Sequence, residues 1–299
     1  MPNSKIPLQP PSVGLYAGPI IDAHIHLFDP RRVEGIPWPE KDSPIHKPSL
    51  PSDYFELAKP FGIEGAIAVE ASPWPRDNEW LLEACRSHPG MVGFVGNFFP
   101  EDINFPAALE RFSSEPEFLG IRYGNLWGRD LGQALLGARF KTSMRDLAAA
   151  GRVLDSANPD PGLLRALLRL SDAAPELRIV IDHLPNANFT AAQRARFLTD
   201  LRELAARETV FIKLSEVPKS VGGKVSLSAS FYSDWLDQLW GLFGAGRIIF
   251  GSDWPNCNLT APFADTVQLS RDYLASKPLH EQEQVLFTNA KLVYRLSSV

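Results

Sequence analysis

The sequence has few of the features that mark secreted or membrane proteins. Among its 299 residues are only two cysteines, Cys85 and Cys257, which match neither a disulfide framework nor a zinc motif, so we interpret both as free thiols. No segment approaches the roughly 20 apolar residues of a membrane span, and the amino terminus has no apolar core of signal-peptide length. We therefore expect a cytoplasmic protein with no membrane partner.

An excess of basic charge is also missing. The formal net charge is −5 and no basic stripe is present, which argues against nucleic acid as a partner. Hydrophobic residues make up 44% and charged residues 22%, as in ordinary globular proteins. A chain of this length has about the size of one barrel domain with insertions.

Segments of strand character recur along the chain, with amphipathic segments of helix length between most of them. The expected strands span residues 20–27, 66–71, 92–98, 119–123, 152–156, 178–184, 210–215 and 247–254. The fifth is the weakest, because it is short and its neighbours are rich in helix formers. A helical segment after the sixth strand opens with a capping box formed by Thr190 and Gln193. This alternation predicts an α/β protein with a parallel sheet, closed as a (β/α)8 TIM barrel. We expect a single domain over residues 1–299, with an insertion at about 28–60 after the first strand.

Residues two apart along a strand share one face, which allows the inner face of each strand to be predicted. The expected inner faces are Ala66, Ala68 and Glu70; Gly93, Val95 and Asn97; Ile179, Ile181 and His183; Phe211 and Lys213; and Ile249, Gly251 and Asp253. In each set a polar group follows apolar or small residues at the carboxyl end of the strand, where barrel enzymes hold their catalytic groups. Glu70 and Lys213 are candidates for shaping the pocket, and the alternative, which we favour, is that they neutralise each other there as a buried ion pair.

Asp22, His24 and His26 are the sharpest local signal, because alternation aims all three side chains to one side of the first strand. Two imidazoles held this close can bind one metal ion or polarise one carbonyl oxygen. The alternative is a pair of core histidines satisfied by hydrogen bonds. We favour the functional interpretation, since burying these groups for packing alone is costly.

Two further polar residues end strands. Asp253 lies in GSDWP at 251–255, where its carboxylate suits a metal ligand or a general base, or alternatively a helix N-cap. His183 lies in IDHLP and is equally compatible with a structural role when considered alone. Its expected inward direction favours a catalytic one.

Five motifs then follow one another along nearly the whole chain: IDAHIHLFDP at 21–30, VIDHLP at 180–185, IKLS at 212–215, FGSDWP at 250–255 and NAKLVYRL at 289–296. In this order they resemble the amidohydrolase-related (amidohydrolase 2) family, and within it the branch of sugar-lactone hydrolases and 2-pyrone-4,6-dicarboxylate hydrolase. The resemblance implies a hydrolase that opens a lactone or another cyclic ester. Its substrate would then be a small molecule. The motifs are specific to the superfamily and not to one substrate.

The resemblance also implies residue roles. His24, His26, His183 and Asp253 match the family's catalytic core, with Asp253 activating the hydrolytic water. Arg122 in GIRY matches an arginine position, and its guanidinium suits the carboxylate of a carboxylated cyclic ester. An ion pair at the barrel rim is the alternative for this arginine.

Metal use stays open at this point. The four core residues form a ligand set for one divalent ion such as zinc, if a metal is bound. The fifth strand offers Asp155 and no histidine, which argues against a binuclear centre. The lactonase branch is similar to enzymes that work without an obligatory metal, so a metal-independent reaction is the alternative. The sequence does not predict the oligomeric state.

Aromatic residues near the expected active site are candidates for substrate contacts. Trp38 and His46 lie in the long proline-rich loop at 30–51, a place where barrel enzymes often carry lids. Trp74 and Trp127 each follow a strand end and are candidates for the same role. Trp38 and His46 could equally pin down their loop. Two other functions remain as alternatives: a metal-dependent decarboxylase of the same superfamily, and a non-catalytic barrel used for binding.

Overall fold

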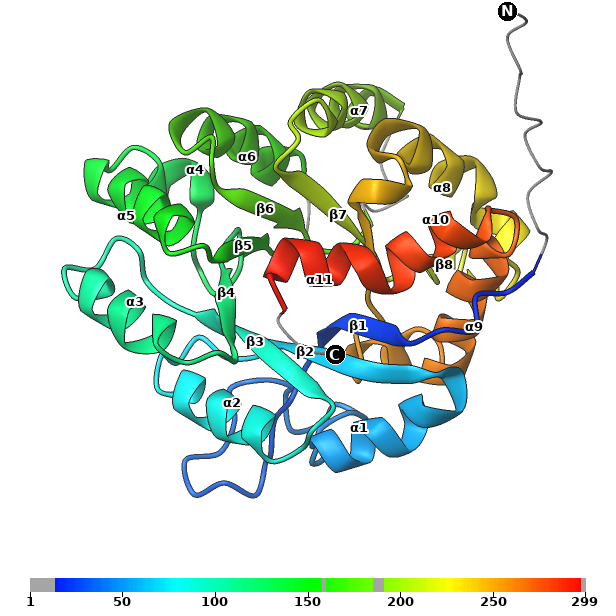
Figure 1. Cartoon of the computed structure of the whole chain (residues 1–299), viewed down its shortest axis with the longest axis horizontal. Helices are drawn as coiled ribbons and strands as arrows, with labels where there is room; N and C mark the ends of the chain where they lie inside the picture. Colours follow the sequence, from blue (N-terminus) through cyan, green and yellow to red (C-terminus); the bar gives the residue numbers. More distant parts are fainter. Residues whose placement is uncertain (1–13, 158–159, 185–190, 297–299) are drawn as a thin grey trace, which may run out of the picture.

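The computed structural model contains one sheet of eight parallel strands surrounded by helices (Figure 1). It describes residues 14–157, 160–184 and 191–296. Neighbouring strands pair in the order β1-β2-β3-β4-β5-β6-β7-β10, so each predicted strand has a counterpart, including the short fifth one. The strands are β1 (Ile20–Ile25), β2 (Ile63–Val69), β3 (Met91–Asn97), β4 (Phe118–Arg122), β5 (Val153–Ser156), β6 (Arg178–Ile181), β7 (Val210–Leu214) and β10 (Ile248–Phe250). The prediction of a (β/α)8 barrel is confirmed.

Most helices connect successive strands and lie on the outside of the ring (Figure 1). The helices are α1 (Pro51–Ala58), α2 (Asp77–Arg86), α3 (Phe105–Ser113), α4 (Leu131–Ala134), α5 (Ala138–Ala149), α6 (Pro161–Ala173), α7 (Ala191–Ala205), α8 (Ala229–Phe243) and, following the last strand, α9 (Phe263–Leu274), α10 (Leu279–Glu283) and α11 (Asn289–Tyr294). Shorter turns of helix are η1 (Lys59–Phe61), η2 (Ala245–Arg247), η3 (Asn256–Leu259) and the π-helix η4 (Gln284–Thr288), and a small hairpin pairs β8 (Ser220–Val221) with β9 (Lys224–Val225). None of the helices in the described part of the chain has the length and apolar character that a membrane crossing requires. The predicted capping box at Thr190 lies outside the described residues.

Backbone hydrogen bonds between β1 and the segment after β10 close the ring. The amide of His26 donates to the carbonyl of Trp254 at 2.6 Å, and the amide of Asp253 donates to the carbonyl of His24 at 2.8 Å. A parallel bridge between Ile25 and Trp254 lies between them. The first and last strands of the chain therefore meet at their carboxyl ends.

The interior of the barrel is filled by an apolar cluster that differs in part from the predicted inner faces. It contains Ile67 and Val69 of β2 and Val180 of β6, together with residues of α11, which lies across one end of the barrel (Figure 1). Ala66, Ala68, Ile179 and Ile181 belong instead to the cluster between strands and helices. The predicted faces of the second and sixth strands were therefore wrong. Strands of a parallel barrel are buried and apolar on both faces, so alternation carries no polarity signal there.

The loop between β1 and α1 spans residues 26–50 and folds back on itself. An antiparallel bridge pairs Phe28 with Ser49. The amide of Phe28 donates to the carbonyl of Ser49 at 3.2 Å, and the amide of Ser49 donates to the carbonyl of Phe28 at 2.9 Å. Pro51 then begins α1, where a residue without an amide hydrogen is tolerated. This loop lies at the carboxyl end of β1, beside the site described below.

Asp22 does not share the direction of His24 and His26, which corrects the sequence-based prediction. The pairing of β1 with β2 shifts register between Asp22 and Ile25, so strict alternation fails there. The carboxylate of Asp22 accepts hydrogen bonds from the hydroxyl of Tyr54 at 2.7 Å and from the amide of Ser252 at 2.8 Å. Asp22 thus links β1 to α1 and to the segment after β10.

We predict that Tyr54→Phe lowers the free energy of unfolding by about 2 kcal/mol, because the buried Asp22 carboxylate then loses the hydrogen bond from the Tyr54 hydroxyl. Urea unfolding followed by circular dichroism measures the change. Tyr273→Phe is the matched control, since its hydroxyl donates to Asp237, whose side chain is 57% exposed. Equal losses in the two variants would contradict the structural role of Asp22.

Candidate active site

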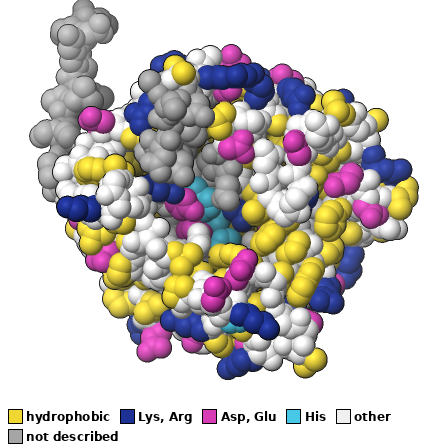
Figure 2. All heavy atoms as spheres, turned by 180° about the vertical axis from the view of Figure 1, so that it is seen from behind, with side chains coloured by type: hydrophobic (Ala, Val, Ile, Leu, Met, Phe, Trp, Pro, Cys, Tyr) yellow, Lys and Arg dark blue, Asp and Glu magenta, His cyan; other side chains and the backbone are white. Residues whose placement is uncertain are grey.

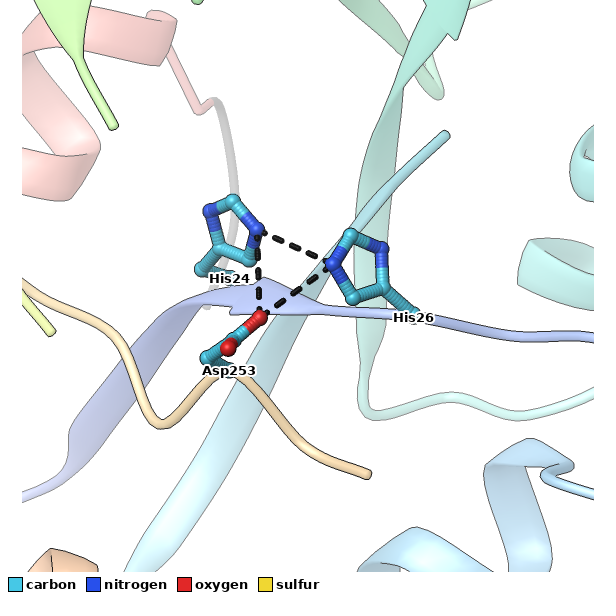
Figure 3. Close-up of side chains that lie close together, drawn as sticks. All are labelled: His24, His26 and Asp253. Carbon is cyan, nitrogen blue, oxygen red and sulfur yellow. Dashed lines mark hydrogen bonds and ion pairs between the residues drawn. The ribbon is translucent and has the colours of Figure 1, made fainter. Parts of the chain in front are cut away.

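Three side chains from the two ends of the chain converge at the carboxyl end of the barrel (Figure 3). Asp253 Oδ1 lies 3.2 Å from His26 Nε2 and 3.7 Å from His24 Nε2, and the two Nε2 atoms are 3.3 Å apart. His183 completes the predicted core, since its ring centroid lies 4.5 Å from that of His24. The structure thus brings together all four residues that the sequence indicated.

The local backbone explains how these side chains reach a common place. His183 and Asp253 both have left-handed backbone angles, with φ of 63° and 61°, at positions just beyond the last residues of β6 and β10. A non-glycine residue in this region costs roughly 1–3 kcal/mol, and such residues concentrate at functional sites. Gly251 is needed as well, because a Cβ there would lie 2.8 Å from the Cβ of His24.

Asp253 is a buried carboxylate in which only one oxygen has a hydrogen-bond partner among the described residues. Its Oδ2 accepts a hydrogen bond from Asn256 Nδ2 at 2.6 Å, whereas Oδ1 is buried and has no hydrogen-bond partner among the described residues. Burial by itself would raise the pKa of Asp253, but the side chains of His183 and His26 outweigh it and hold the pKa below its ordinary value. Asp253 therefore stays ionised and can take a proton or bind a cation.

His26 presents an unprotonated nitrogen to the site in its neutral form. Its Nδ1 lies 2.9 Å from the carbonyl oxygen of Val69, which can only accept a hydrogen bond, so Nδ1 must carry the hydrogen. The lone pair of a neutral imidazole then lies on Nε2, the atom that faces Asp253 Oδ1.

His24 has two possible arrangements. Its Nδ1 lies 3.0 Å from Lys213 Nζ and 3.4 Å from Asp182 Oδ1. When Lys213 donates to Nδ1, the Nε2 atom carries the hydrogen and can donate it into the site. When Nδ1 donates to Asp182, the lone pair lies on Nε2 instead. Burial and the nearby Lys213 hold the pKa of His24 well below its usual range, so the ring is neutral in both cases.

A buried network of opposite charges lies beneath these residues. Lys213 Nζ is 2.6 Å from Asp155 Oδ2 and 2.8 Å from Asp182 Oδ1, and all three side chains are fully buried. Tyr294 of α11 donates its hydroxyl to Asp155, with its oxygen 2.9 Å from Oδ2. Burial raises the pKa of Asp155 to about 6, whereas the cations of Lys213 and Arg122 outweigh burial at Asp182 and hold its pKa well below the ordinary value.

The predicted ion pair between Glu70 and Lys213 was therefore wrong. Lys213 is matched by Asp155 and Asp182, and Glu70 instead accepts hydrogen bonds from Trp127 Nε1 and from the amide of Ser72. Both residues lie at the carboxyl ends of barrel strands, but the sequence alone does not predict which charged side chains become their neighbours.

Arg122 is engaged inside the barrel and not in an ion pair at the exposed rim. Its Nε donates to Asp182 Oδ2 at 2.8 Å, and Nη1 lies 3.8 Å from Glu70 Oε1. Burial by itself would lower the pKa of Arg122, but Asp182 and Glu70 outweigh it, so the guanidinium stays charged. Its charge is matched by protein carboxylates, which bears on the substrate that the site accepts.

A cavity of about 220 Å³ opens above this group. Its described wall is formed by His26, Trp38, Glu70, Ala71, Arg122, Leu126, Trp127, His183, Glu216 and Asn256. In a view from behind Figure 1, histidine and carboxylate side chains are visible in a hollow of the surface (Figure 2). Trp38 and Trp127 thus lie where the sequence-based prediction expected substrate contacts.

His46 and Trp74 are not part of this described wall. His46 Nδ1 donates to the carbonyl of Pro39 at 2.7 Å, which pins the loop after β1. The ring of Trp74 packs under the guanidinium of Arg76, whose Cζ lies 4.4 Å from the ring centroid. For His46 the structure favours the alternative of holding its own loop in place, and Trp74 does not line the described wall that was expected for it.

Several residues of the site were not singled out from the sequence. Asp182 precedes His183 in the same motif, and its position next to a candidate histidine was a signal for the site. Strict alternation, however, assigned its side chain to the outer face of the strand. Glu216 and Asn256 follow the ends of β7 and β10, which is the only signal they carry. Their roles depend on contacts between distant segments.

The donor atoms fit one divalent metal ion. One ligand atom from each of His24, His26 and Asp253 lies within 4.8 Å of the others, and the oxygen of Asp253 is otherwise unpartnered. Two imidazole nitrogens and a carboxylate oxygen form a donor set that suits zinc, with a fourth position left for water. His24 contributes only in the arrangement in which Nδ1 donates to Asp182.

Comparison with known proteins places this barrel in a family. A family model described as Amidohydrolase matches residues 21–296, and the chain belongs to this amidohydrolase family. The resemblance inferred from the five motifs is thereby confirmed.

Relatives of known activity share most of the chain's length. The chain is 28% identical over 256 residues to an L-fucono-1,5-lactonase of Burkholderia ambifaria, covering 82% of this chain and 83% of the relative. It is 26% identical over 279 residues to a 4-sulfomuconolactone hydrolase of Rhizobium radiobacter, covering 86% and 87%. A solved amidohydrolase structure from Burkholderia multivorans with bound zinc superposes with a TM-score of 0.81 at 23% identity, covering 93% and 99%, and supports the fold.

We predict that Lys213→Met destabilises the protein by about 3–5 kcal/mol, because Asp155 and Asp182 are then left buried without a cation. Denaturant unfolding measures the loss, and adding Asp155→Asn to the same chain should recover part of it. Lys277→Met is the control, since its partner Asp237 is largely exposed and the pair contributes less than about 1 kcal/mol. Equal effects of the two lysine substitutions would argue against the buried network.

Proposed function

We propose that this chain opens lactones by hydrolysis, with Asp253 as the group that activates water. The observation that carries the proposal is the ionised, buried carboxylate of Asp253, whose Oδ1 has no hydrogen-bond partner among the described residues and lies beside the imidazoles. The names of the relatives support the reaction class, since both describe hydrolysis of a lactone.

In this mechanism the proton moves between water, Asp253 and the product. Asp253 Oδ1 takes a proton from a water molecule, whose oxygen attacks the carbonyl carbon of the lactone. The ring C–O bond then breaks, and Asp253 returns the proton to the leaving oxygen. The net change is addition of one water to the lactone to give a hydroxy acid, so no other reactant is needed.

The imidazoles around Asp253 have a second task in the proposal. His24, when its Nε2 carries the hydrogen, and His183 lie beside the place where the carbonyl oxygen becomes negative, and hydrogen bonds from their rings steady that charge without any movement. His183 is itself held by Ser215, whose Oγ lies 2.9 Å from Nδ1. A rigid arrangement of this kind favours the transition state over the bound substrate.

We infer further that the active site binds one divalent ion through the side chains of His24, His26 and Asp253. Such an ion would polarise the lactone carbonyl and lower the pKa of a bound water when present. The residues' own task is then to hold the ligand atoms: Val69 fixes the ring of His26, and Asn256 fixes the carboxylate of Asp253.

We predict that Asp253→Asn lowers kcat for lactone opening by at least about a hundredfold while the fold is kept, because an amide cannot take the proton from water. Proton release at constant pH measures the rate, and circular dichroism checks the fold. Asp237→Asn is the matched control at the surface and should retain full activity. Full activity of the Asp253 variant, or release of carbon dioxide in place of lactone opening, would contradict the proposal.

We predict a zinc content of about one ion per chain after loading and desalting, measured by plasma mass spectrometry. His26→Asn should remove most of it, because one of three ligand atoms is lost. His280→Asn, an exposed histidine on α10, is the control and should leave the zinc content unchanged. Retention of zinc by the His26 variant would show that the ion binds elsewhere.

A further inference from the structure

Glu216 is a carboxylate of the cavity wall that the reaction as proposed does not use. It lies two residues beyond the end of β7, has a left-handed backbone angle with φ of 50°, and its side chain is 26% exposed. Its Oε1 lies 3.9 Å from Nε2 of His183. A strained conformation held at a cavity wall indicates a position under functional constraint.

The two oxygens of Glu216 have different surroundings. Lys219, three residues further along the chain, forms an ion pair with Oε2. Oε1 is left facing His183 and the cavity, where it can accept hydrogen bonds from a bound molecule. The lysine thus fixes the direction of the carboxylate without covering its other oxygen.

Carboxylates outnumber cations around the described wall. Arg122 is the one lysine or arginine in its described lining, and its charge is offset by Asp182, 2.8 Å from Nε, and by Glu70, 3.8 Å from Nη1. A carboxylate or sulfonate on a substrate would therefore meet Glu70 and Glu216 together with a guanidinium whose charge is already offset.

Aromatic rings complete the wall. The indoles of Trp38 and Trp127 offer flat apolar surfaces, and the ring of Trp127 is fixed because its Nε1 donates to Glu70. Carboxylate oxygens next to such rings suit a molecule with hydroxyl groups on an apolar carbon frame.

We propose that Glu216 determines specificity: its Oε1 accepts hydrogen bonds from hydroxyl groups of an uncharged lactone, and its charge disfavours lactones that carry a carboxylate or sulfonate. This inference rests on the proposed lactone-opening function. It departs from the sequence-based expectation that Arg122 receives a substrate carboxylate, because the charge of that guanidinium is already offset by Asp182 and Glu70.

Binding of stable lactams tests the proposal without requiring turnover. Two polyhydroxylated six-membered lactams are compared by calorimetry with the full-length protein, one with a hydroxymethyl group and one with a carboxylate at the same ring carbon. The uncharged lactam should bind at least tenfold more tightly. Glu216→Gln should reduce that ratio at least fivefold, whereas Glu110→Gln, an exposed residue on α3, should leave it unchanged.

A second variant makes the surroundings of Glu216 more negative, whereas Glu216→Gln makes them less negative. Lys219→Met removes the cation beside Glu216 and should increase discrimination against the carboxylated lactam. Equal or tighter binding of the carboxylated lactam by the unaltered protein, no binding of either lactam, or an unchanged ratio in Glu216→Gln would each overturn the inference. If the lactam preference holds but no lactone is opened, the proposed function fails while the role of Glu216 in binding stands.

Discussion

The pairing of β1 with the segment after β10 is the constraint on which the site depends. Two short backbone hydrogen bonds join His26 to Trp254 and Asp253 to His24, and they close eight strands into a ring. Because the strands are parallel, closure brings their carboxyl ends to one edge. The histidines near the start of the chain and the carboxylate near its end can meet only when this seam forms, so the ability to do chemistry depends on complete folding.

Electrostatics beneath the site impose a second constraint. Carboxylates gathered around buried imidazoles would repel one another, and Lys213 and Arg122 supply the compensating charge from inside the barrel. Tyr294 extends the network to α11, which lies across one end of the barrel (Figure 1). The charged network beneath the site is therefore continuous with the packing that completes the barrel, and the charges of both cations are offset by protein carboxylates.

Backbone strain is concentrated where the strands end. His183, Glu216 and Asp253 all have left-handed backbone angles although none is glycine, and each lies just beyond a strand of the barrel. Such conformations persist only when the surrounding structure holds them. At His183 and Glu216 they turn into the cavity side chains that regular alternation from the inward Val180 and Phe211 would direct elsewhere. The site therefore forms although the inner face predicted for β6 was wrong.

The sequence by itself determined the strand order, the barrel and the histidine and aspartate motifs, because these depend on local hydrophobic pattern and on residue types at strand ends. The family resemblance followed from those motifs, and the family model confirms it. Only the tertiary structure decided that Asp22 braces α1, that Lys213 pairs with Asp155 and Asp182, and that Glu216 faces the cavity. These outcomes depend on register shifts, on strained turns and on which distant charges become neighbours, and none of these is encoded by the spacing of residues along one strand.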